Sequence, residues 1–258
     1  MPSVLQISPT KVVQFRTRQL DMLSIELARK SYAGFVPSCE AYDMLGTIHM
    51  YVWELVRGQA FCRVRHRFLA PGMEVYLTQT IQDFARFFAS AWTNRQSVEL
   101  PPSLCDEYVK TLDTLSRSLP QRFLPKLEEI RLSLPLLFRT EYPVVVQHDD
   151  LLENNIHVDE DTGRITGIVD WHDVMIAPFG VSLGSLEIVL GVQNGSTWHL
   201  HYDHVNLRKH FWDTLYRIIG EVSDVDRQCI EIARLFGLFR LYGPEENAAA
   251  YLDALCWL

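Results

Sequence analysis

The segment from Val144 to Gly180 constrains the fold of this 258-residue chain more than any other part of its sequence. It contains three short apolar runs rich in β-branched residues, with a polar loop after the first run and a DEDTG turn after the second. This order is typical of a strand, a loop and a β-hairpin. Because paired strands lie about 4.7–4.9 Å apart, we expect the polar loops at the ends of the hairpin to lie side by side.

Three oxygen-bearing side chains occupy these loops, namely Asp150, Asn155 and Asp170. Such a set suits Mg²⁺, which prefers a few protein oxygens together with water and substrate phosphates. His148, Asp150 and Asn155 also have the H-x-D-x-x-x-x-N spacing of a kinase catalytic loop. Asp and Asn are common turn residues, so each one alone fits a simple hairpin. Their joint order favours a phosphoryl-transfer site.

The same stretch resembles the aminoglycoside phosphotransferase and choline kinase group, whose members read roughly H-G-D-x-x-x-x-N and later hydrophobic-D-W. The segments GRITGIVDW, IAPFGVSLGSLE and QDFARFFASAW are similar to a fungal branch of that group. The resemblance implies that Asp150, with His148 beside it, is the catalytic residue and acts as the base. It also implies that Asn155 and Asp170 are Mg²⁺ ligands and that ATP is a possible cofactor.

The resemblance further implies an α+β, protein-kinase-like fold. A truncated, β-rich N-lobe with its hinge is expected at residues 1–58, and a larger, mainly helical C-lobe at residues 59–258. In the family, the loop after the Mg²⁺-binding Asp borders the substrate site. Asp173 and Glu187 lie in or beyond this loop and are therefore candidates for the substrate side.

The expected N-lobe departs from the family at the nucleotide site. Kinase-like enzymes carry a strand Lys that pairs with the nucleotide phosphates and with an acidic residue on the next helix. By resemblance, Gln14 takes the place of this Lys, and Asp21 or Glu26 that of the acid. Lys11 lies three residues earlier, on the opposite face of the strand. No glycine precedes Gly34, which indicates a shortened member, an incomplete gene model, or a protein that no longer handles ATP in the usual way.

Apolar periodicity predicts the other elements. A hairpin is expected from the runs Ser3–Ile7 and Lys11–Phe15, and a strand, a Leu45-Gly46 turn and another strand after Gly34. Helices are expected at about Gln19–Lys30, Val75–Trp92, Leu104–Ser118, Pro125–Leu134, Ser182–Leu190, Trp198–Trp212 and Arg227–Tyr242.

Composition limits the partners of the chain. A formal net charge of −8 argues against a nucleic-acid or anionic-membrane partner, which normally needs a basic surface. No apolar run approaches the roughly 18 residues of a membrane span. The five cysteines show no C-x-x-C spacing and fit reduced thiols. We expect a cytoplasmic protein with a small-molecule substrate, and the sequence leaves its oligomeric state open.

Three functions remain open from the sequence. The first is phosphoryl transfer from ATP to a hydroxyl of a small molecule, weakened because Gln14 is neutral. The second is an ATP-independent lyase, dehydratase or cyclase in which Asp150, His148 and Asp173 act as acid–base groups. The third is a pseudokinase that acts as a binding module, although a scaffold has no physical need for converging metal ligands.

Overall fold

A four-stranded antiparallel sheet forms the N-terminal part of the chain in the computed structural model, which describes residues 3–256. The strands are β1 (Ser3–Ser8), β2 (Lys11–Arg16), β3 (Cys39–Leu45) and β4 (Ile48–Glu54). Their spatial order is β1-β2-β4-β3, so β2 and β4 lie at the centre. The predicted pairings of β1 with β2 and of β3 with β4 are both confirmed.

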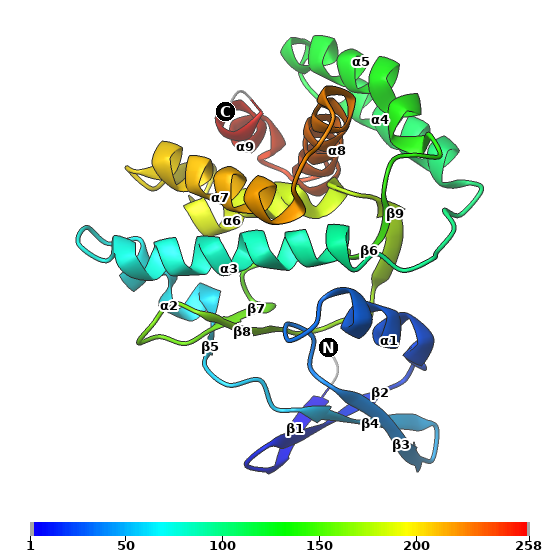
Figure 1. Ribbon diagram of the computed structural model, residues 1–258, viewed down its shortest axis with the longest axis vertical. Helices are drawn as coiled ribbons and strands as arrows, with labels where there is room; N and C mark the ends of the chain where they lie inside the picture. The colour runs from blue at the N-terminus through cyan, green and yellow to red at the C-terminus, as the bar shows by residue number, and fades with distance from the viewer. Residues whose placement is uncertain (1–2, 257–258) are drawn as a thin grey trace.

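Helix α1 (Met22–Ser31) joins the sheet to the rest of the molecule (Figure 1). Asp21 is its N-cap and accepts hydrogen bonds from two backbone amides of the first turn. Ile25 and Ala28 are buried on its inner face. Just past the helix, the Tyr32 hydroxyl donates to the Val146 carbonyl at 2.6 Å, which ties α1 to the strand that precedes the catalytic loop.

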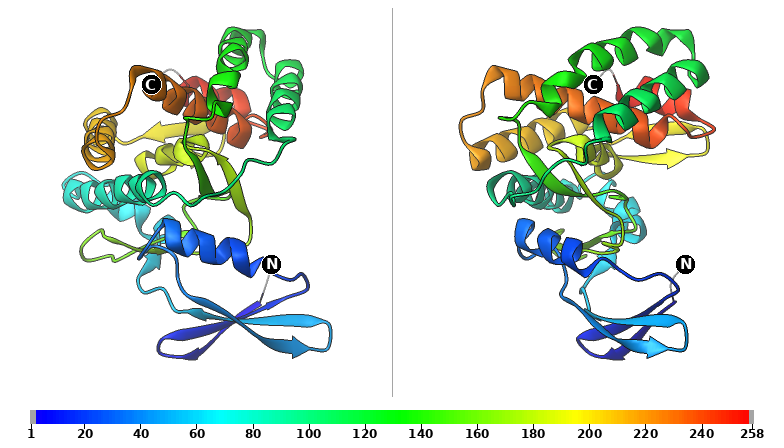
Figure 2. Two further views of the ribbon diagram at one scale, coloured as in Figure 1. Left: turned by 45° about the vertical axis from the view of Figure 1, so that its right-hand side comes forward. Right: turned by 90° about the vertical axis from the view of Figure 1, so that its right-hand side faces the viewer.

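The C-terminal part combines three small sheets, one of them a hairpin at residues 191–200, with a layer of helices (Figure 2). Strands β6 (Val144–His148) and β9 (Val174–Pro178) form an antiparallel pair, and β5 (Gln59–Ala60), β7 (Ile156–Val158) and β8 (Ile165–Ile168) form the second sheet. The helices are α2 (Phe61–Phe68), α3 (Glu74–Thr93), α4 (Leu104–Ser118), α5 (Leu124–Ser133), α6 (Leu186–Leu190), α7 (His204–Ile219), α8 (Asp224–Tyr242) and α9 (Ala248–Leu255). None of the helices between residues 3 and 256 is long and apolar enough to cross a membrane.

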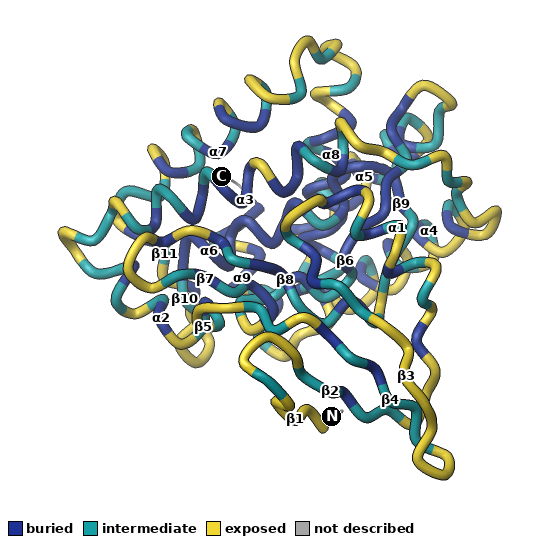
Figure 3. The backbone as a smooth tube through the Cα atoms, turned by 60° about the horizontal axis from the view of Figure 1, so that its bottom comes forward, coloured by how far each residue is buried: buried dark blue, intermediate teal, exposed yellow. Residues whose placement is uncertain are grey.

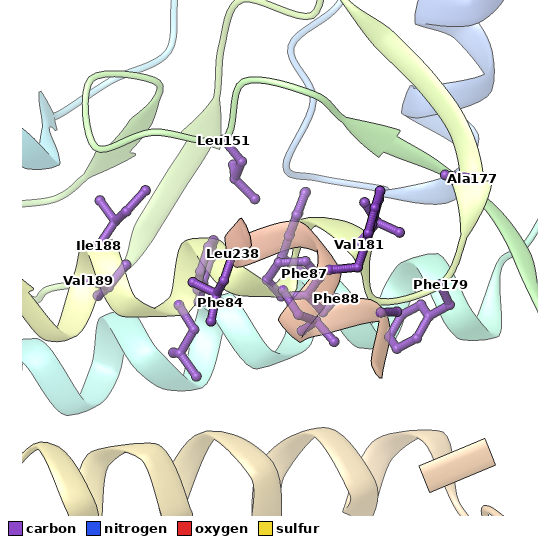
Figure 4. Close-up of a cluster of buried hydrophobic side chains, with 14 of the residues drawn as sticks. Phe84, Phe87, Phe88, Leu151, Ala177, Phe179, Val181, Ile188, Val189 and Leu238 are labelled. Atoms are coloured by element: carbon purple, nitrogen blue, oxygen red, sulfur yellow. The ribbon is translucent and has the colours of Figure 1, made fainter. Parts of the chain in front are cut away.

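The main core surrounds α3, whose aromatic face is buried (Figure 4). Phe84, Phe87 and Phe88 are each at most 2% exposed. Full burial of such a side chain stabilises a fold by roughly 1.5–3 kcal/mol relative to exposure. The Phe87 ring also stacks on Tyr32 with a centroid distance of 4.2 Å. The core therefore continues from α3 to the end of α1 and supports the strand that leads into the catalytic loop.

Close backbone contact fixes α8 beside the segment that follows β9. A Cβ atom added to Gly237 in α8 would lie 1.8 Å from the carbonyl oxygen of Val181, so this crossing requires glycine. Val181 belongs to a 3₁₀ turn (Val181–Ser185) that precedes α6. The helix predicted at Ser182–Leu190 is therefore confirmed only in its second half.

The predicted helix at Trp198–Trp212 is wrong at its start. Residues 191–200 form a hairpin of β10 (Gly191–Asn194) and β11 (Thr197–Leu200), and α7 begins only at His204. The reason is an Asn194-Gly195 turn, with Gly195 at a φ of +60°, which is a strong hairpin signal. Trp198 lies in β11 and packs edge-on against Tyr251 of α9.

Candidate active site

The predicted catalytic loop, residues 148–155, begins at the end of β6, where His148 is only 2% exposed. Its Nε2 lies 2.9 Å from the Val169 carbonyl oxygen, and its Nδ1 accepts the backbone N–H of Asp150 at 3.1 Å. Burial lowers the pKa of His148, which favours the neutral ring that both contacts require. His148 therefore holds two loops in place, and neither ring nitrogen is free to transfer a proton.

Asp150 and Asn155 are joined by hydrogen bonds within this loop. The Asn155 side-chain amide is almost fully buried and donates to the Asp150 carbonyl at 2.8 Å and to Oδ2 of the Asp150 carboxylate at 3.2 Å. The Asn155 side-chain oxygen accepts from Asn154 at 3.1 Å. The other carboxylate oxygen of Asp150, Oδ1, has no hydrogen bond to any residue of the described chain. It is therefore available to an incoming hydroxyl group.

Strand pairing brings Asp170 close to Asn155. Ile156 of β7 pairs with Ile168 of β8, and the Val169 N–H donates to the Asn155 carbonyl at 2.9 Å. Asp170 follows directly, at a φ of +64°, where an L-residue other than glycine is uncommon. Among the described non-glycine residues it alone has a positive φ. Such outliers concentrate at functional sites, where they direct a side chain against local preference.

The donor set fits a hard divalent cation. Oδ1 of Asp170 is buried and has no hydrogen-bond partner among the described residues, and the Asn155 side-chain oxygen has a single one. Oxygen donors of this kind are the ligands that Mg²⁺ prefers. No group of three His, Cys, Asp or Glu side chains within residues 3–256 is placed to hold a metal alone. A cation held by the Asn155 amide oxygen and the Asp170 carboxylate would therefore complete its shell with water and phosphate oxygens.

Two cationic or polar side chains border Asp170. A guanidinium nitrogen of Arg16, at the end of β2, lies 3.8 Å from Oδ1 of Asp170, which is an ion-pair distance beyond hydrogen-bond range. The His172 ring lies between two carboxylates. Its Nδ1 is 3.0 Å from the same Oδ1 of Asp170 but is not aligned for a hydrogen bond, and its Nε2 is 2.8 Å from Oδ2 of Asp173. The Asp173 side chain is 61% exposed, as expected for a residue at the mouth of a site.

A cleft of about 520 Å³ opens beside His172 and Asp173, between α4 and β9. Its polar lining comes from Glu107, Tyr108, Thr111, Asp149, His172, Asp173 and Arg240. Arg240 of α8 forms an ion pair with Asp149 inside it. The Tyr108 hydroxyl is buried and has no hydrogen-bond partner among the described residues. The cleft therefore offers both charged and uncharged polar groups to a small molecule.

Three other predicted site residues are engaged elsewhere. Gln14 is 8% exposed, and its side-chain oxygen accepts from the Trp53 indole at 3.1 Å. Asp21 caps α1, and the hydrogen bonds of that cap lower its pKa. Glu187 is fully buried and pairs with Arg208 at 2.6 Å. No hydrogen bond or ion pair within residues 3–256 links any of the three to the catalytic loop.

The sequence interpretation missed Arg16 and Arg240. The sequence could have indicated Arg16, because residues two apart in a strand share a face and Gln14 occupies the predicted nucleotide-binding position. Arg240 lies 91 positions from Asp149, and no local pattern connects the two residues. Only the packing of α8 against the catalytic loop brings them together.

A small β-sheet part followed by a helical part that carries a catalytic loop and a hairpin defines an α+β, protein-kinase-like fold. The chain matches the family described as "Phosphotransferase enzyme family" (APH) over residues 4–213, which is most of its length. It therefore belongs to the APH phosphotransferase family, which includes the aminoglycoside phosphotransferase and choline kinase-like proteins. No curated protein gave a significant match.

Solved structures support the fold. A choline/ethanolamine kinase family protein from Mesorhizobium loti is 16% identical, with a TM-score of 0.59 and coverage of 98% of this chain and 82% of that one. An aminoglycoside phosphotransferase from Streptomyces rimosus, in complex with ADP and streptomycin, is 16% identical, with a TM-score of 0.53 and coverage of 90% and 91%. A choline kinase from Streptococcus pneumoniae is 11% identical, with a TM-score of 0.51 and coverage of 99% and 88%.

Proposed function

We propose that this protein transfers the γ-phosphoryl group of ATP to a hydroxyl of a small molecule, with Mg²⁺ as cofactor. The observation that carries the proposal is the joining of Asp150, Asn155 and Asp170 by the catalytic-loop hydrogen bonds and the β7–β8 pairing. The similar aminoglycoside phosphotransferase from Streptomyces rimosus was solved with ADP and streptomycin, which is consistent with this chemistry.

Asp150 acts as the base in the proposed reaction. Its free Oδ1 accepts the proton of the acceptor hydroxyl while the oxygen of that hydroxyl forms a bond to the γ-phosphorus. The bond from the γ-phosphorus to the bridging oxygen breaks, and ADP leaves. Asn155 holds the Asp150 carboxylate in place through its other oxygen. Bound to Asn155 and Asp170, Mg²⁺ would neutralise charge on the phosphates.

The acceptor is proposed to occupy the cleft between α4 and β9. His172 and Asp173 connect this cleft to Asp170 through contacts of 3.0 and 2.8 Å. An acceptor bound there would place its hydroxyl near the catalytic loop. Asp173 thus stays a substrate-side candidate, whereas the burial of Glu187 favours a structural role.

We further propose that the reaction is slow and that the N-lobe is a shortened one. Gln14 is neutral and faces Trp53, so it supplies no charge to a phosphate. The β1–β2 connection turns through Pro9 and Thr10 instead of a glycine-rich loop. In this proposal residues 1–58 form the N-lobe and hinge and residues 59–258 the C-lobe, and the fungal-branch likeness also stays a prediction.

Calorimetric titration with ATP, with and without Mg²⁺, tests the proposal. The unmodified chain is expected to bind ATP in a Mg²⁺-dependent manner. Asp170→Ala should weaken that binding about a hundredfold or more, because even outer-shell changes at metal sites cost 10–100-fold. Asp161→Ala, in the exposed turn between β7 and β8, is the matched control and should bind like the unmodified chain.

Two outcomes would contradict the proposal. No detectable binding at millimolar ATP would exclude an ATP-dependent kinase and direct attention to ATP-independent acid–base chemistry at Asp150. Equal Mg²⁺-dependent binding by Asp170→Ala and the unmodified chain would refute the assignment of Asp170 as a metal ligand.

A further inference from the structure

On the inner face of the N-terminal sheet, the guanidinium group of Arg16 lies near the Asp170 carboxylate. Side chains two residues apart in a strand lie on the same face, so Gln14 and Arg16 share a face of β2. Their partners in β4 are Tyr51 and His49. Tyr51 is 2% exposed, so this face is the one that packs toward the rest of the molecule. Arg16 therefore lies on the face where the proposed nucleotide site requires positive charge.

Arg16 lies near the Asp170 carboxylate, but its buried guanidinium nitrogen makes no hydrogen bond with it. The Arg16 side chain is 13% exposed, and its nearest guanidinium nitrogen lies 3.8 Å from Oδ1 of Asp170. That nitrogen is buried and has no hydrogen-bond partner among the described residues. A buried guanidinium nitrogen without a hydrogen bond is unfavourable, and an anion that reached it would relieve this cost.

Other basic residues of the N-terminal part are less well placed. Lys11 is exposed and lies on the opposite face of β2 from Gln14. Arg18 is exposed in the connection between β2 and α1. Arg29 forms an ion pair with Glu26 on the surface of α1.

We propose that Arg16 is the nucleotide-phosphate-binding cation of this protein, displaced by two residues from the strand position that Gln14 occupies. The inference rests on the proposed function. Without nucleotide, Arg16 lies against Asp170 and its positive charge opposes cation binding there. When Mg²⁺ and ATP bind together, the phosphates draw Arg16 away from Asp170, so metal and nucleotide favour each other's binding.

The experiment compares the unmodified chain with Arg16→Gln, Arg16→Lys and Arg18→Gln. Three probes are titrated by calorimetry: Mg²⁺ with ATP, adenosine alone, and Mn²⁺ alone. In Arg16→Gln, Mg²⁺-ATP should bind about ten- to a hundredfold more weakly, because a hydrogen bond to a charged group is lost. Adenosine, which has no phosphate, should bind equally well. Mn²⁺ alone should bind several-fold more tightly, because a like charge has left the site.

Arg16→Lys should recover part of the Mg²⁺-ATP affinity, and Arg18→Gln should resemble the unmodified chain with all three probes. The opposite signs of the ATP and Mn²⁺ effects separate this role from a structural one, which would weaken both and lower the melting temperature. Equal Mg²⁺-ATP affinity in Arg16→Gln and the unmodified chain would overturn the inference and leave the proposed function intact. No Mg²⁺-ATP binding by the unmodified chain would overturn both.

Discussion

The N-terminal sheet and the catalytic hairpin carry the two halves of the proposed site and hold them differently. In the hairpin region, His148 and Asn155 are at most 3% exposed and are fixed by hydrogen bonds to backbone groups. In the sheet, β1 and β3 are exposed over most of their length (Figure 3). Packing therefore restrains residue identity in the hairpin region and in the central strands of the sheet, whereas the edge strands β1 and β3 are less restrained.

The largest expected effect tests the rigidity of the C-terminal part. Glu187 of α6 is 1% exposed, accepts from Arg208 at 2.6 Å, and lies 3.8 Å from Arg234. Glu187→Ala should lower the free energy of unfolding by about 3–5 kcal/mol, because it leaves the largely buried guanidinium group of Arg208 without its carboxylate partner. Urea unfolding measures this change.

The control is the exposed pair of Arg122 with Asp253, in which Asp253→Ala should cost less than about 1 kcal/mol. Similar losses in both variants would show that the buried pair is no more important than a surface pair. A changed KM for an acceptor at unchanged stability would instead support Glu187 as a substrate-side residue.

The second prediction concerns Gln14, the neutral residue at the strand position where kinase-like enzymes carry a Lys. Gln14→Lys should not improve ATP binding, because position 14 is 8% exposed and faces the Trp53 indole. The variant should lose about 1–3 kcal/mol of stability, since the indole N–H loses its acceptor and an ammonium group is buried. Urea unfolding and Mg²⁺-ATP titration give the two readouts.

Gln6→Lys is the matched control, because Gln6 is exposed on the neighbouring strand and lies on the same face through its pairing with Val12. Its stability should change by less than about 0.5 kcal/mol. Stronger Mg²⁺-ATP binding in Gln14→Lys would show that the strand position still faces the nucleotide, and it would weaken the assignment of Arg16.

Features that depend on local sequence patterns could be predicted, whereas contacts between distant segments could not. The catalytic loop and hairpin were predictable because Asp150, Asn155 and Asp170 lie within 21 residues and follow local strand and turn patterns. The strands of the N-terminal sheet were predictable for the same reason. The Arg240–Asp149 pair was not, because it depends on how α8 packs. The β10–β11 hairpin stands where apolar spacing predicts the start of a helix, because the turn at Gly195 favours a hairpin there.

The smallest expected effect is a pH dependence in the C-terminal part. Burial and the nearby positive charge of Arg63 lower the pKa of His157 in β7 below its usual 6.5. The unfolded chain therefore binds this proton more readily than the folded chain. Stability from neutral His157 is fully present above pH 6.5 and is lost as the pH falls from 6.5 through the lowered pKa of the folded state.

His157→Gln should therefore flatten the decline of unfolding free energy between about pH 6.5 and pH 5, measured by urea unfolding at each pH. The effect is partial, because burial lowers the pKa of three further histidines, His148, His201 and His204. His199→Gln, at an exposed position of β11, serves as the control and should leave the slope unchanged. An unchanged slope in His157→Gln would mean that water reaches this ring in the folded protein, and that the hairpin is less tightly closed than the burial of its neighbours indicates.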